Sequence, residues 1–457
     1  MQVNSFCLNA KIIESEIIIC YNDFINNLNR FKGKYMKKGM YENFIAILTE
    51  ELIPAMGCTE PIALAYAASK ARDVLDGTPE KIIAKCSGNI IKNVRCVRIP
   101  NSGGMTGVEA ACVLGALCGK SEKFMEVLSE VDDNGRSHAR EFLKASKCSV
   151  EYLESNIPLH FIIELENKES KVKVEVRHSH TNIVLIEKNG KIIFEADDDY
   201  KEAVLTDREN LSIENIYNFA ENIEIERILP FVTKQIECNM AIAEKGMQGG
   251  FGLGIGKEIL EAYAGTAITK AKAYAAAASE ARMEGCDMPV IITSGSGNQG
   301  IASTVPLIVY ARESGISEER LYRSLVFSSL LTVFQKEFIG KLSAFCGAVS
   351  ASCASGAAIT YMIGGSVKQI KDTIDNTMAN IPGIICDGAK ASCAAKIASA
   401  LDASFFAHAL AMKGKVYEAN TGILQDDTGK TIKSVGHIGK VGMKQTDSEI
   451  VKFMIKN

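Results

Sequence analysis

The stretch between His160 and Glu195 decides the fold, because four apolar or alternating segments follow one another there with turns between them. They read His160-Phe-Ile-Ile-Glu-Leu-Glu166, Val172-Lys-Val-Glu-Val-Arg177, Thr181-Asn-Ile-Val-Leu-Ile186 and Lys191-Ile-Ile-Phe-Glu195. Segments of this length and pattern are typical of strands. Lys188-Asn189-Gly190 lies between the last two segments and favours a tight hairpin turn. The sequence therefore predicts a small antiparallel sheet near residues 150–200.

Helical spacing dominates on both sides of this stretch. Apolar residues recur every four positions in residues 41–52, which predicts a helix. A second helix is expected over residues 59–71, since Pro61 is favoured in a first helical turn. Further helices are expected over residues 107–118 and from residue 213 onward, including an alanine-rich one between residues 264 and 282.

Three short strands are expected outside the sheet region. Residues 82–86 and 94–99 have strand character and are joined by the turn-prone Ser87-Gly88-Asn89. A third strand, residues 288–293, leads through a glycine-rich exit into a helix. The predicted class is α+β, with a mostly helical body and a smaller antiparallel sheet region.

Composition and charge exclude several classes of function. The chain has 457 residues, 47% of them hydrophobic, which is ample for a buried core. Its net charge is -4 and it has no long basic stripe, so nucleic acid is not an expected partner. Residues 342–367 are uncharged, but their many Ser, Thr and Gly residues favour a close-packed internal helix over a membrane span.

The 14 cysteines are expected to be reduced. No signal peptide is apparent at the N-terminus, where Lys11, Glu14 and Glu16 interrupt the apolar residues. Cysteines scattered through a large chain are typical of a cytoplasmic protein. Disulfides are therefore not expected.

Two cysteine pairs have the same spacing and similar surroundings. Cys386 and Cys393 lie in Ile381-Pro-Gly-Ile-Ile-Cys-Asp-Gly-Ala-Lys-Ala-Ser-Cys393, and Cys346 and Cys353 lie in a segment of small uncharged residues. Seven residues of continuous helix span about 10 Å, so both members of a pair can bind one metal cluster only where the helix is broken. Pro382, Gly383 and Gly388 supply such a break. Between Cys346 and Cys353 only Gly347 does so, and one ligand, preferably Cys346, is expected from that pair.

Alternatives to a metal cluster remain open. Structural zinc sites usually have two to four residues between paired cysteines, and the compact ferredoxin spacing is absent. Buried cysteines can also be plain core residues. Three thiolates on a four-iron cluster would leave one iron open to substrate.

Cys58 stands apart from the two pairs. At the start of the helix over residues 59–71, backbone N–H groups and the helix dipole would favour its thiolate, whereas Glu60 would oppose it. Such a thiol could act as a nucleophile, a base or a metal ligand.

The glycine-rich Ser294-Gly-Ser-Gly-Asn-Gln-Gly300 matches G-x-G-x-x-G. No second strand ending in an acidic residue follows, so a dinucleotide fold is not indicated. The same geometry can bind an anion such as a substrate carboxylate, with Ser296, Asn298 and Gln299 as donors. A plain tight turn is the alternative. A second glycine-rich segment, residues 249–257, fails as a phosphate-binding loop because Glu258 follows its lysine.

Several of these motifs together resemble one known family. Gly57-Cys58-Thr59-Glu60-Pro61, His180-Thr181-Asn182, the Ser294–Gly300 loop, Cys346-Gly347 and Cys386-Asp387-Gly388 are similar to the L-cysteine desulfidase and iron–sulfur L-serine dehydratase alpha-like family over about residues 40–457. The resemblance implies a buried 4Fe–4S cluster held by Cys346, Cys386 and Cys393. It also implies a small amino-acid substrate, with Cys58 as proton acceptor.

The implied reaction is an α,β-elimination that converts L-cysteine into pyruvate, ammonia and sulfide. His180, Thr181 and Asn182, together with Ser296, Asn298 and Gln299, would orient the substrate. In the related serine dehydratases the last two ligand cysteines are more widely separated, so Cys353 stays an alternative ligand. L-serine dehydration, a non-catalytic iron–sulfur redox or oxygen sensor, and a pyridoxal-phosphate enzyme are the competing functions.

The pattern along the chain also suggests how it is divided. Residues 1–38 are expected to be an N-terminal extension, and residues 39–457 a single catalytic unit. Within that unit we expect a sheet-rich part, about 150–205, and a helical cluster-binding part, about 210–457. No membrane association is expected, and the sequence allows a homo-oligomer.

Overall fold

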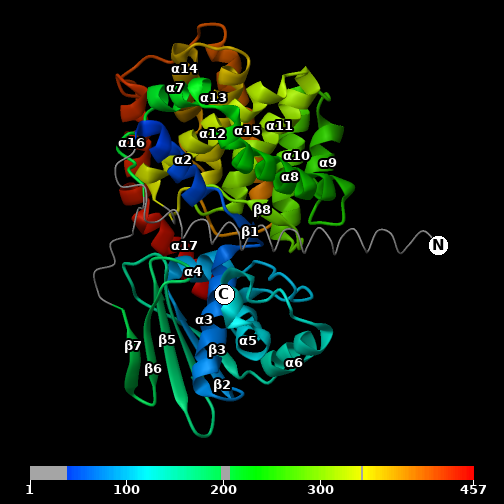
Figure 1. The fold of residues 1–457 in the computed structure, drawn as a ribbon, viewed down its shortest axis with the longest axis vertical. Helices are drawn as coiled ribbons and strands as arrows, with labels where there is room; N and C mark the ends of the chain where they lie inside the picture. The colour runs from blue at the N-terminus through cyan, green and yellow to red at the C-terminus, as the bar shows by residue number, and fades with distance from the viewer. Residues whose placement is uncertain (1–38, 197–205, 341–342, 457) are drawn as a thin grey trace, which may run out of the picture.

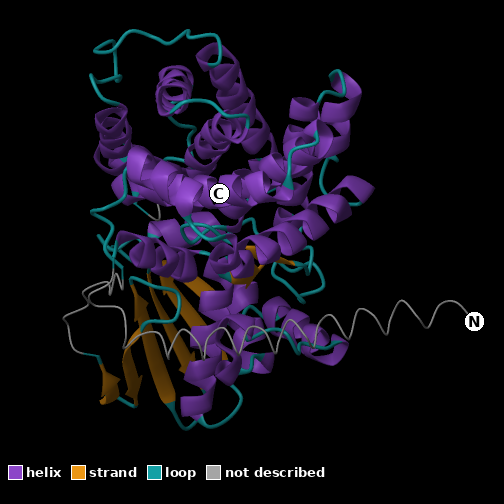
Figure 2. Cartoon of the chain, turned by 45° about the horizontal axis from the view of Figure 1, so that its top comes forward, coloured by secondary structure: helices purple, strands orange, loops and turns teal. Residues whose placement is uncertain are grey.

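Two lobes make up the part of the chain that the computed structural model describes, residues 39–196, 206–340 and 343–456. A sheet lobe (residues 59–195) lies below a helical lobe (residues 40–56 and 213–456) in Figure 1. Figure 2 shows the long strands gathered in the sheet lobe and the helices filling the other. The predicted α+β class is confirmed. The predicted extension, residues 1–38, lies outside the described residues.

The sheet lobe is a six-stranded sheet covered by helices. Its strands run in the order β3 (Cys148–Tyr152), β2 (Lys81–Cys86), β4 (His160–Glu166), β5 (Lys171–Arg177), β6 (Ile183–Lys188) and β7 (Lys191–Glu195). Alternate residues such as Phe161 and Val174 are fully buried on the face that packs on α3 (Thr59–Leu75). α5 (Gly107–Cys118), η1 (Ser121–Glu126) and α6 (Asp133–Lys144) complete the lobe.

The sheet confirms the four predicted strands and extends beyond them. Asn189 and Gly190 both have positive φ in the predicted hairpin turn between β6 and β7. One pair of strands, β2 and β3, is parallel, so the sheet is mixed and not wholly antiparallel. The parallel pair requires a crossover, which the helices between residues 88 and 144 provide.

The predicted strand over residues 94–99 is wrong. Residues 88–94 form a helix instead, α4 (Gly88–Val94), with Ser87 as its N-cap. Ile90, Ile91 and Val94 are all buried at helical spacing, and this packing outweighs their β-branched strand preference. Residues 94–99 contribute only an isolated bridge between Arg98 and Thr106.

The helical lobe contains most of the remaining elements. They are α2 (Met40–Glu51), α7 (Ile213–Asn222), α8 (Ile225–Gln248), α9 (Ile255–Ala262), α10 (Ala267–Met283), α11 (Gly297–Ser314), α12 (Glu318–Ile339), α13 (Gly347–Met362), α14 (Val367–Asn380), α15 (Cys393–Ala411), α16 (Thr428–His437), η2 (Ile438–Gly442) and α17 (Lys444–Lys456). α13 is buried from Ala348 to Met362, which confirms the internal helix predicted in the uncharged segment. No helix among the described residues is both long enough and apolar enough to cross a bilayer.

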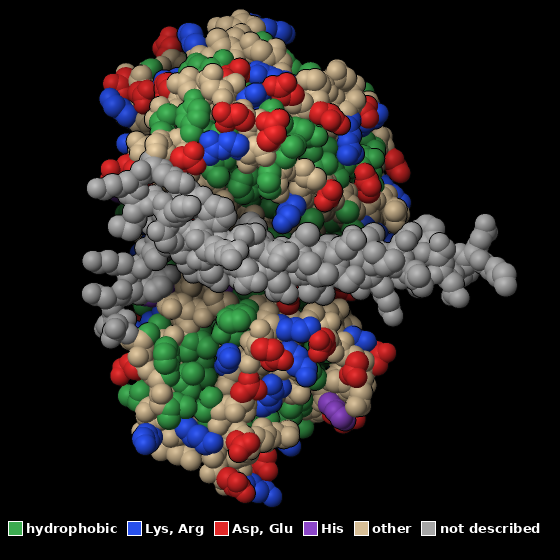
Figure 3. Space-filling model, in the orientation of Figure 1, with side chains coloured by type: hydrophobic (Ala, Val, Ile, Leu, Met, Phe, Trp, Pro, Cys, Tyr) green, Lys and Arg blue, Asp and Glu red, His purple; other side chains and the backbone are tan. Residues whose placement is uncertain are grey.

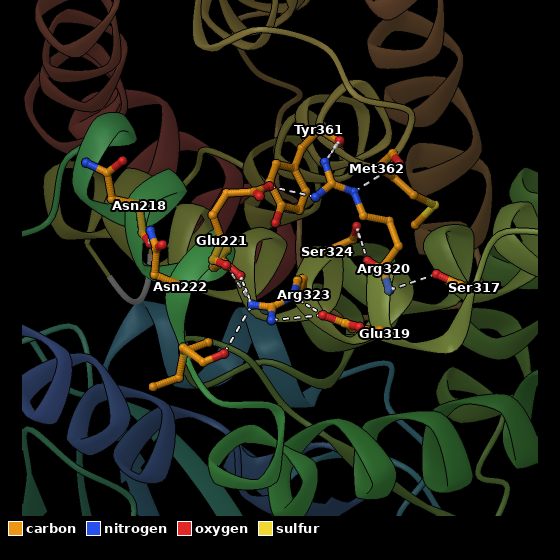
Figure 4. Close-up of polar contacts among 12 residues, drawn as sticks. Asn218, Glu221, Asn222, Ser317, Glu319, Arg320, Arg323, Ser324, Tyr361 and Met362 are labelled. Carbon is orange, nitrogen blue, oxygen red and sulfur yellow. Dashed lines mark hydrogen bonds and ion pairs between the residues drawn. The ribbon is translucent and has the colours of Figure 1, made fainter.

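Arg320 and Arg323 of α12 form polar contacts with α7 and α13, as Figure 4 shows. The Arg323 guanidinium donates to the carbonyls of Glu221 and Ile223 at the end of α7, at 3.0 and 3.1 Å. Arg320 lies 3.8 Å from the ring centroid of Tyr361 on α13 and pairs with the Glu221 carboxylate at 2.6 Å. These contacts satisfy helix-end carbonyls that would otherwise lack partners.

A short two-stranded sheet brings distant segments together. β1 (Pro54–Met56) pairs antiparallel with β8 (Pro289–Ile291). The segment leading to Cys58 therefore lies beside the segment leading into the Ser294–Gly300 loop. β8 confirms part of the predicted strand over residues 288–293, whereas β1 has only three residues and was not predicted.

The two lobes also meet through α17, which packs against α4 (Figure 1). Lys92 of α4 is 1% exposed and pairs with Asp447 of α17. Val451 lies against Gly88 so closely that a Cβ at Gly88 would come within 2.9 Å of it. On the face shown in Figure 3, acidic and basic side chains are interspersed over both lobes.

Candidate active site

Cys58 lies at the start of α3, where the two lobes meet. It is the N-cap of α3 and follows Gly57, whose φ is +60°. A side chain at Gly57 would lie 2.4 Å from Pro100, so only glycine fits this turn. The helix start expected from the sequence is confirmed.

The Cys58 thiol is nevertheless neutral. Its side chain is buried, and this burial raises its pKa to about 11, although the Arg282 guanidinium beside it acts in the opposite direction. Glu60 and Cys393 raise the pKa further. Loss of hydration therefore outweighs the helix start that was expected to favour the thiolate.

Cys346 and Cys386 come from segments that pair with each other. Phe345 and Ile385 form an antiparallel bridge, in which the Cys346 N–H donates to Ile384 O at 2.9 Å and the Cys386 N–H donates to Ala344 O at 2.7 Å. The Cys346 and Cys386 side chains interact with each other, and this interaction lowers the pKa of Cys386 and raises that of Cys346. One of these two sulfurs is therefore prepared to be a thiolate.

Cys393 lies between these two cysteines and Cys58. It is the first residue of α15, so the helix is broken between it and Cys386 as predicted. Gly388 has a φ of +96°, and a Cβ there would come within 2.1 Å of Lys92 O. Cys393 packs in one small cluster with Cys58, and its charge interacts with that of Cys386. The structure thus brings Cys58, Cys346, Cys386 and Cys393 together.

Cys353 does not belong to this group of cysteines. It is fully buried inside α13, its thiol is hydrogen-bonded with Thr377, and its nearest ionisable neighbour is Asp375. Burial raises its pKa to about 12. Its surroundings are those of a core residue.

The Ser294–Gly300 loop lies against the cysteines. Gln299 is buried so close to Gly347 that a Cβ there would meet its amide nitrogen at 2.6 Å. Asn298 accepts hydrogen bonds from Ser279 and Arg282, at 3.2 and 3.3 Å. Ser296 is the N-cap of α11. Of the three residues predicted here, Asn298 is thus held by protein partners and Gln299 lies next to Cys346.

The same loop has buried polar atoms without a hydrogen-bond partner in the described part of the chain. They are the hydroxyls of Thr293 and Ser294 and the side-chain oxygen of Gln299. Ser294 has a φ of 48°, a strained conformation for a residue with a side chain. Unsatisfied buried polar atoms are costly and often indicate a ligand site. The sequence did not indicate Thr293 and Ser294 as ligand-binding residues, because both precede the first glycine of the G-x-G-x-x-G motif.

A cleft of about 1400 Å³ runs between the lobes beside these residues. Thr59, Glu60 and Ser294 line one part of it, and His180 and Thr181 line the part formed by the sheet lobe. Asn182 donates to Arg177 O at 2.9 Å and holds the turn that carries these two residues. The predicted residues His180 and Thr181 therefore face the same cleft as the loop.

Among the described residues, five cations lie near the cysteines, and none was singled out in the sequence. They are Lys92 of α4, Arg282 of α10, Lys336 of α12, Lys390 in the loop before α15 and Lys396 of α15. Lys336 is 6% exposed, and burial lowers its pKa to about 8 although Cys346 and Cys386 oppose the shift. A lone lysine after twelve uncharged residues of helix, 324–335, was the available signal in the sequence.

Cys346, Cys386 and Cys393 are the residues that could hold a metal group. Among the described residues, no three Cys, His, Asp or Glu side chains converge closely enough to hold one metal ion. The ligands of a polynuclear cluster bind different metal atoms and can lie further apart, so a cluster is the kind of group that these three thiols could bind.

Comparison with known proteins identifies the family of the chain. Residues 122–452 match the family model described as serine dehydratase alpha chain. A UPF0597 protein of Desulfitobacterium hafniense is 46% identical over 91% of this chain and 97% of its own. A UPF0597 protein of Treponema denticola is 44% identical over 92% of this chain and 100% of its own. The chain therefore belongs to the serine dehydratase alpha chain family.

Proposed function

We propose that this protein is an iron–sulfur-dependent lyase that carries out α,β-elimination on a small L-amino acid, with L-cysteine as the favoured substrate. The observation that carries the proposal is the meeting of three cysteines from two segments beside a fourth, Cys58, whose neighbour Thr59 lines a cleft. Membership of a family described by its serine dehydratase chain supports the lyase class.

Cys346, Cys386 and Cys393 would hold a 4Fe–4S cluster. Bound there, the cluster would supply a Lewis acid for the substrate's carboxylate and its leaving group. The interaction between Cys346 and Cys386 already favours one thiolate, and metal binding requires thiolates.

Cys58 would take the proton from the substrate's α-carbon. The electrons of the broken C–H bond would form the Cα–Cβ double bond, and the Cβ–S bond would break with release of sulfide. The aminoacrylate that remains hydrolyses to pyruvate and ammonia. Cys58 must first lose its own proton, and Arg282, which donates to its sulfur, is the group placed to stabilise the thiolate.

Polar groups in and beside the cleft would bind the rest of the substrate. Ser294, which lines the cleft, and the nearby Gln299 offer polar atoms without partners among the described residues, near the start of α11, which suits a carboxylate. His180 and Thr181 line the part of the cleft formed by the sheet lobe, with Asn182 holding their turn. Ser296 and Asn298 would act mainly by fixing the loop, since Asn298 is held by Ser279 and Arg282.

The test is anaerobic reconstitution with iron and sulfide, followed by assays of sulfide release from L-cysteine and of pyruvate release from L-serine. We expect both the broad absorption of an iron–sulfur cluster and sulfide release. L-serine dehydration is the second candidate, because the family is described as a serine dehydratase chain. Pyruvate from serine without sulfide from cysteine would establish it. A cluster whose spectrum neither amino acid alters would instead indicate a sensor.

A further inference from the structure

Glu60 is a carboxylate in the cleft that has no cationic partner among the described residues. It lies in the first turn of α3, two residues after Cys58, and lines the cleft together with Thr59. One of its oxygens accepts a hydrogen bond from the Thr59 hydroxyl at 3.1 Å, and the other accepts one from Asn93 Nδ2 at 3.3 Å. Both donors are neutral groups. The carboxylate is therefore held in place, but its charge is not balanced by an ion pair.

The other carboxylates that line the cleft are either paired with a cation or exposed. Glu51, for example, pairs with Arg208 at 2.8 Å, and Glu154 is exposed to solvent. Glu60 is half-buried, so it has lost part of its hydration without gaining a positive charge. A cation that enters the cleft with a ligand would offset this loss.

A second acceptor without a partner lies on the same part of the cleft. Asn89 precedes Asn93 by four residues, so the two side chains share one face of α4. Asn93 holds Glu60, whereas the side-chain oxygen of Asn89 is buried and has no hydrogen-bond partner in the described part of the chain. Asn89 also lines the cleft. Both acceptors therefore have capacity for a donor that these residues do not supply.

Donors that suit a carboxylate lie in the neighbouring segment. The unsatisfied hydroxyl of Ser294 lines the same cleft, just before α11. The pairing of β1 with β8 places the segment that leads to Glu60 beside the segment that leads to Ser294. An α-amino acid has an ammonium group and a carboxylate on one carbon atom. A cleft with acceptors on one segment and donors on the adjacent one suits such a ligand.

We propose that Glu60 and Asn89 form the subsite for the α-ammonium group of the substrate, with Glu60 supplying the negative charge and Asn89 a further acceptor. The subsite selects ligands with a free amine over hydroxy acids of the same shape, and it holds Cα in one orientation. The inference rests on the proposed function, since it takes the ligand to be a small amino acid. It does not depend on whether that amino acid is cysteine or serine.

The experiment measures the binding of two ligands to the full chain, reconstituted anaerobically with ferrous iron and inorganic sulfide. L-alanine keeps both charged groups of the substrate but has no leaving group, and L-lactate has a hydroxyl in place of the ammonium group. Calorimetry gives the dissociation constants for the wild type, Glu60→Gln, Asn89→Ala and Glu154→Gln. Glu154→Gln is the matched control, because it removes another carboxylate that lines the cleft.

We expect the wild type to bind L-alanine more tightly than L-lactate. Glu60→Gln should weaken the binding of L-alanine by about tenfold or more, because it removes a charge-assisted hydrogen bond, and should leave the binding of L-lactate nearly unchanged. Asn89→Ala should weaken the binding of L-alanine by roughly threefold to tenfold, since a neutral hydrogen bond contributes less. Glu154→Gln should change neither constant. All variants should keep the cluster's absorption.

Unchanged binding of L-alanine in Glu60→Gln, or an equal loss for both ligands, would overturn the inference. If Glu60→Gln fails to fold, Asn89→Ala decides, because it removes an oxygen atom without a partner among the described residues; unchanged binding of L-alanine in that variant would then overturn the inference. An active wild type that does not distinguish L-alanine from L-lactate would do the same and leave the proposed function standing. A wild type that assembles no cluster and eliminates neither cysteine nor serine would instead contradict the proposed function, and the inference with it.

Discussion

Two properties of Cys58 oppose each other: the proposed mechanism requires it to accept a proton, whereas its burial favours the protonated thiol. Burial raises its pKa, while Arg282 lowers it. The balance between these two effects is what a single substitution can change.

Cys58→Ser should abolish elimination while leaving the cluster's visible absorption intact, because a serine hydroxyl is far too weakly acidic to be the base. The measurement is sulfide release from L-cysteine alongside the absorption spectrum. Loss of the absorption in this variant would make Cys58 a metal ligand. Cys353→Ser is the control, since Cys353 lies in the core away from the four cysteines of the candidate site. This variant should keep both the elimination activity and the visible absorption.

The rate should depend on pH with a defined sign. Because burial places the pKa of Cys58 at about 11, the thiolate fraction is small at neutral pH and grows as pH rises, so kcat/KM should increase from about pH 6 to about pH 10. Arg282→Gln should shift this profile to higher pH and lower kcat/KM at neutral pH roughly tenfold. Arg312→Gln, at an exposed arginine, serves as the control. A profile that falls as pH rises would contradict Cys58 as the base.

At the scale of elements, the loop over residues 381–393 decides whether the sulfurs can meet. Its break lets Cys386 and Cys393 face one site, and its tightest point is Gly388. There both a positive φ and the contact with Lys92 O exclude a side chain.

Gly388→Ala should therefore lower both stability and iron content. A positive φ alone costs about 1–2 kcal/mol with alanine, and the clash adds to this. Gly414→Ala is the matched control, because Gly414 also has a positive φ but open space around it. Chemical unfolding and iron analysis of the two variants separate strain from the clash. Equal losses in both would show that the contact with Lys92 is unimportant.

Periodicity predicted the elements that are fixed locally. The hairpin strands, α3 and the internal α13 follow from spacing, turn residues and small-residue content, and all are present. The missed elements depend on distant partners: β1 has three residues and exists through its pairing with β8, and α4 is helical because its apolar face is buried. Tertiary contacts of this kind leave little trace in a local window.

The candidate site follows the same division. The break between Cys386 and Cys393 was predictable, since proline and glycine act locally. The cations were harder to predict, because Arg282 lies far from the cysteines in sequence, and Lys336, ten residues before Cys346, is marked only by the uncharged helical residues before it. Their contribution appears only when α10 and α12 pack beside the sulfurs.

At the scale of the molecule, the geometry of the cleft depends on how the lobes are joined. Lys92 of the sheet lobe is almost fully buried at the junction and finds its carboxylate, Asp447, on α17. α17 thereby connects the last part of the chain to the first lobe.

Asp447→Asn should destabilise the protein by about 3–5 kcal/mol, because it leaves the Lys92 ammonium buried without an anion. Glu449→Gln removes a carboxylate from the same helix that pairs with Lys452 at the surface, and it should change stability by no more than about 0.5 kcal/mol. Urea unfolding of both variants is the measurement. A similar small effect for Asp447→Asn would mean that the junction does not depend on this pair.

Helices α13 and α14 lie between Cys346 and Cys386 in the chain and pack against each other as a helical hairpin. This packing brings the two cysteines close together. Until that hairpin has packed, a nascent chain offers any metal only scattered single thiols, so metal cannot nucleate folding as it does in a zinc finger. Insertion of the proposed cluster would then follow folding, because iron and sulfide would enter a binding site that has already formed. Under iron limitation, cells would accumulate a folded but inactive protein, which later insertion of iron could activate without new synthesis.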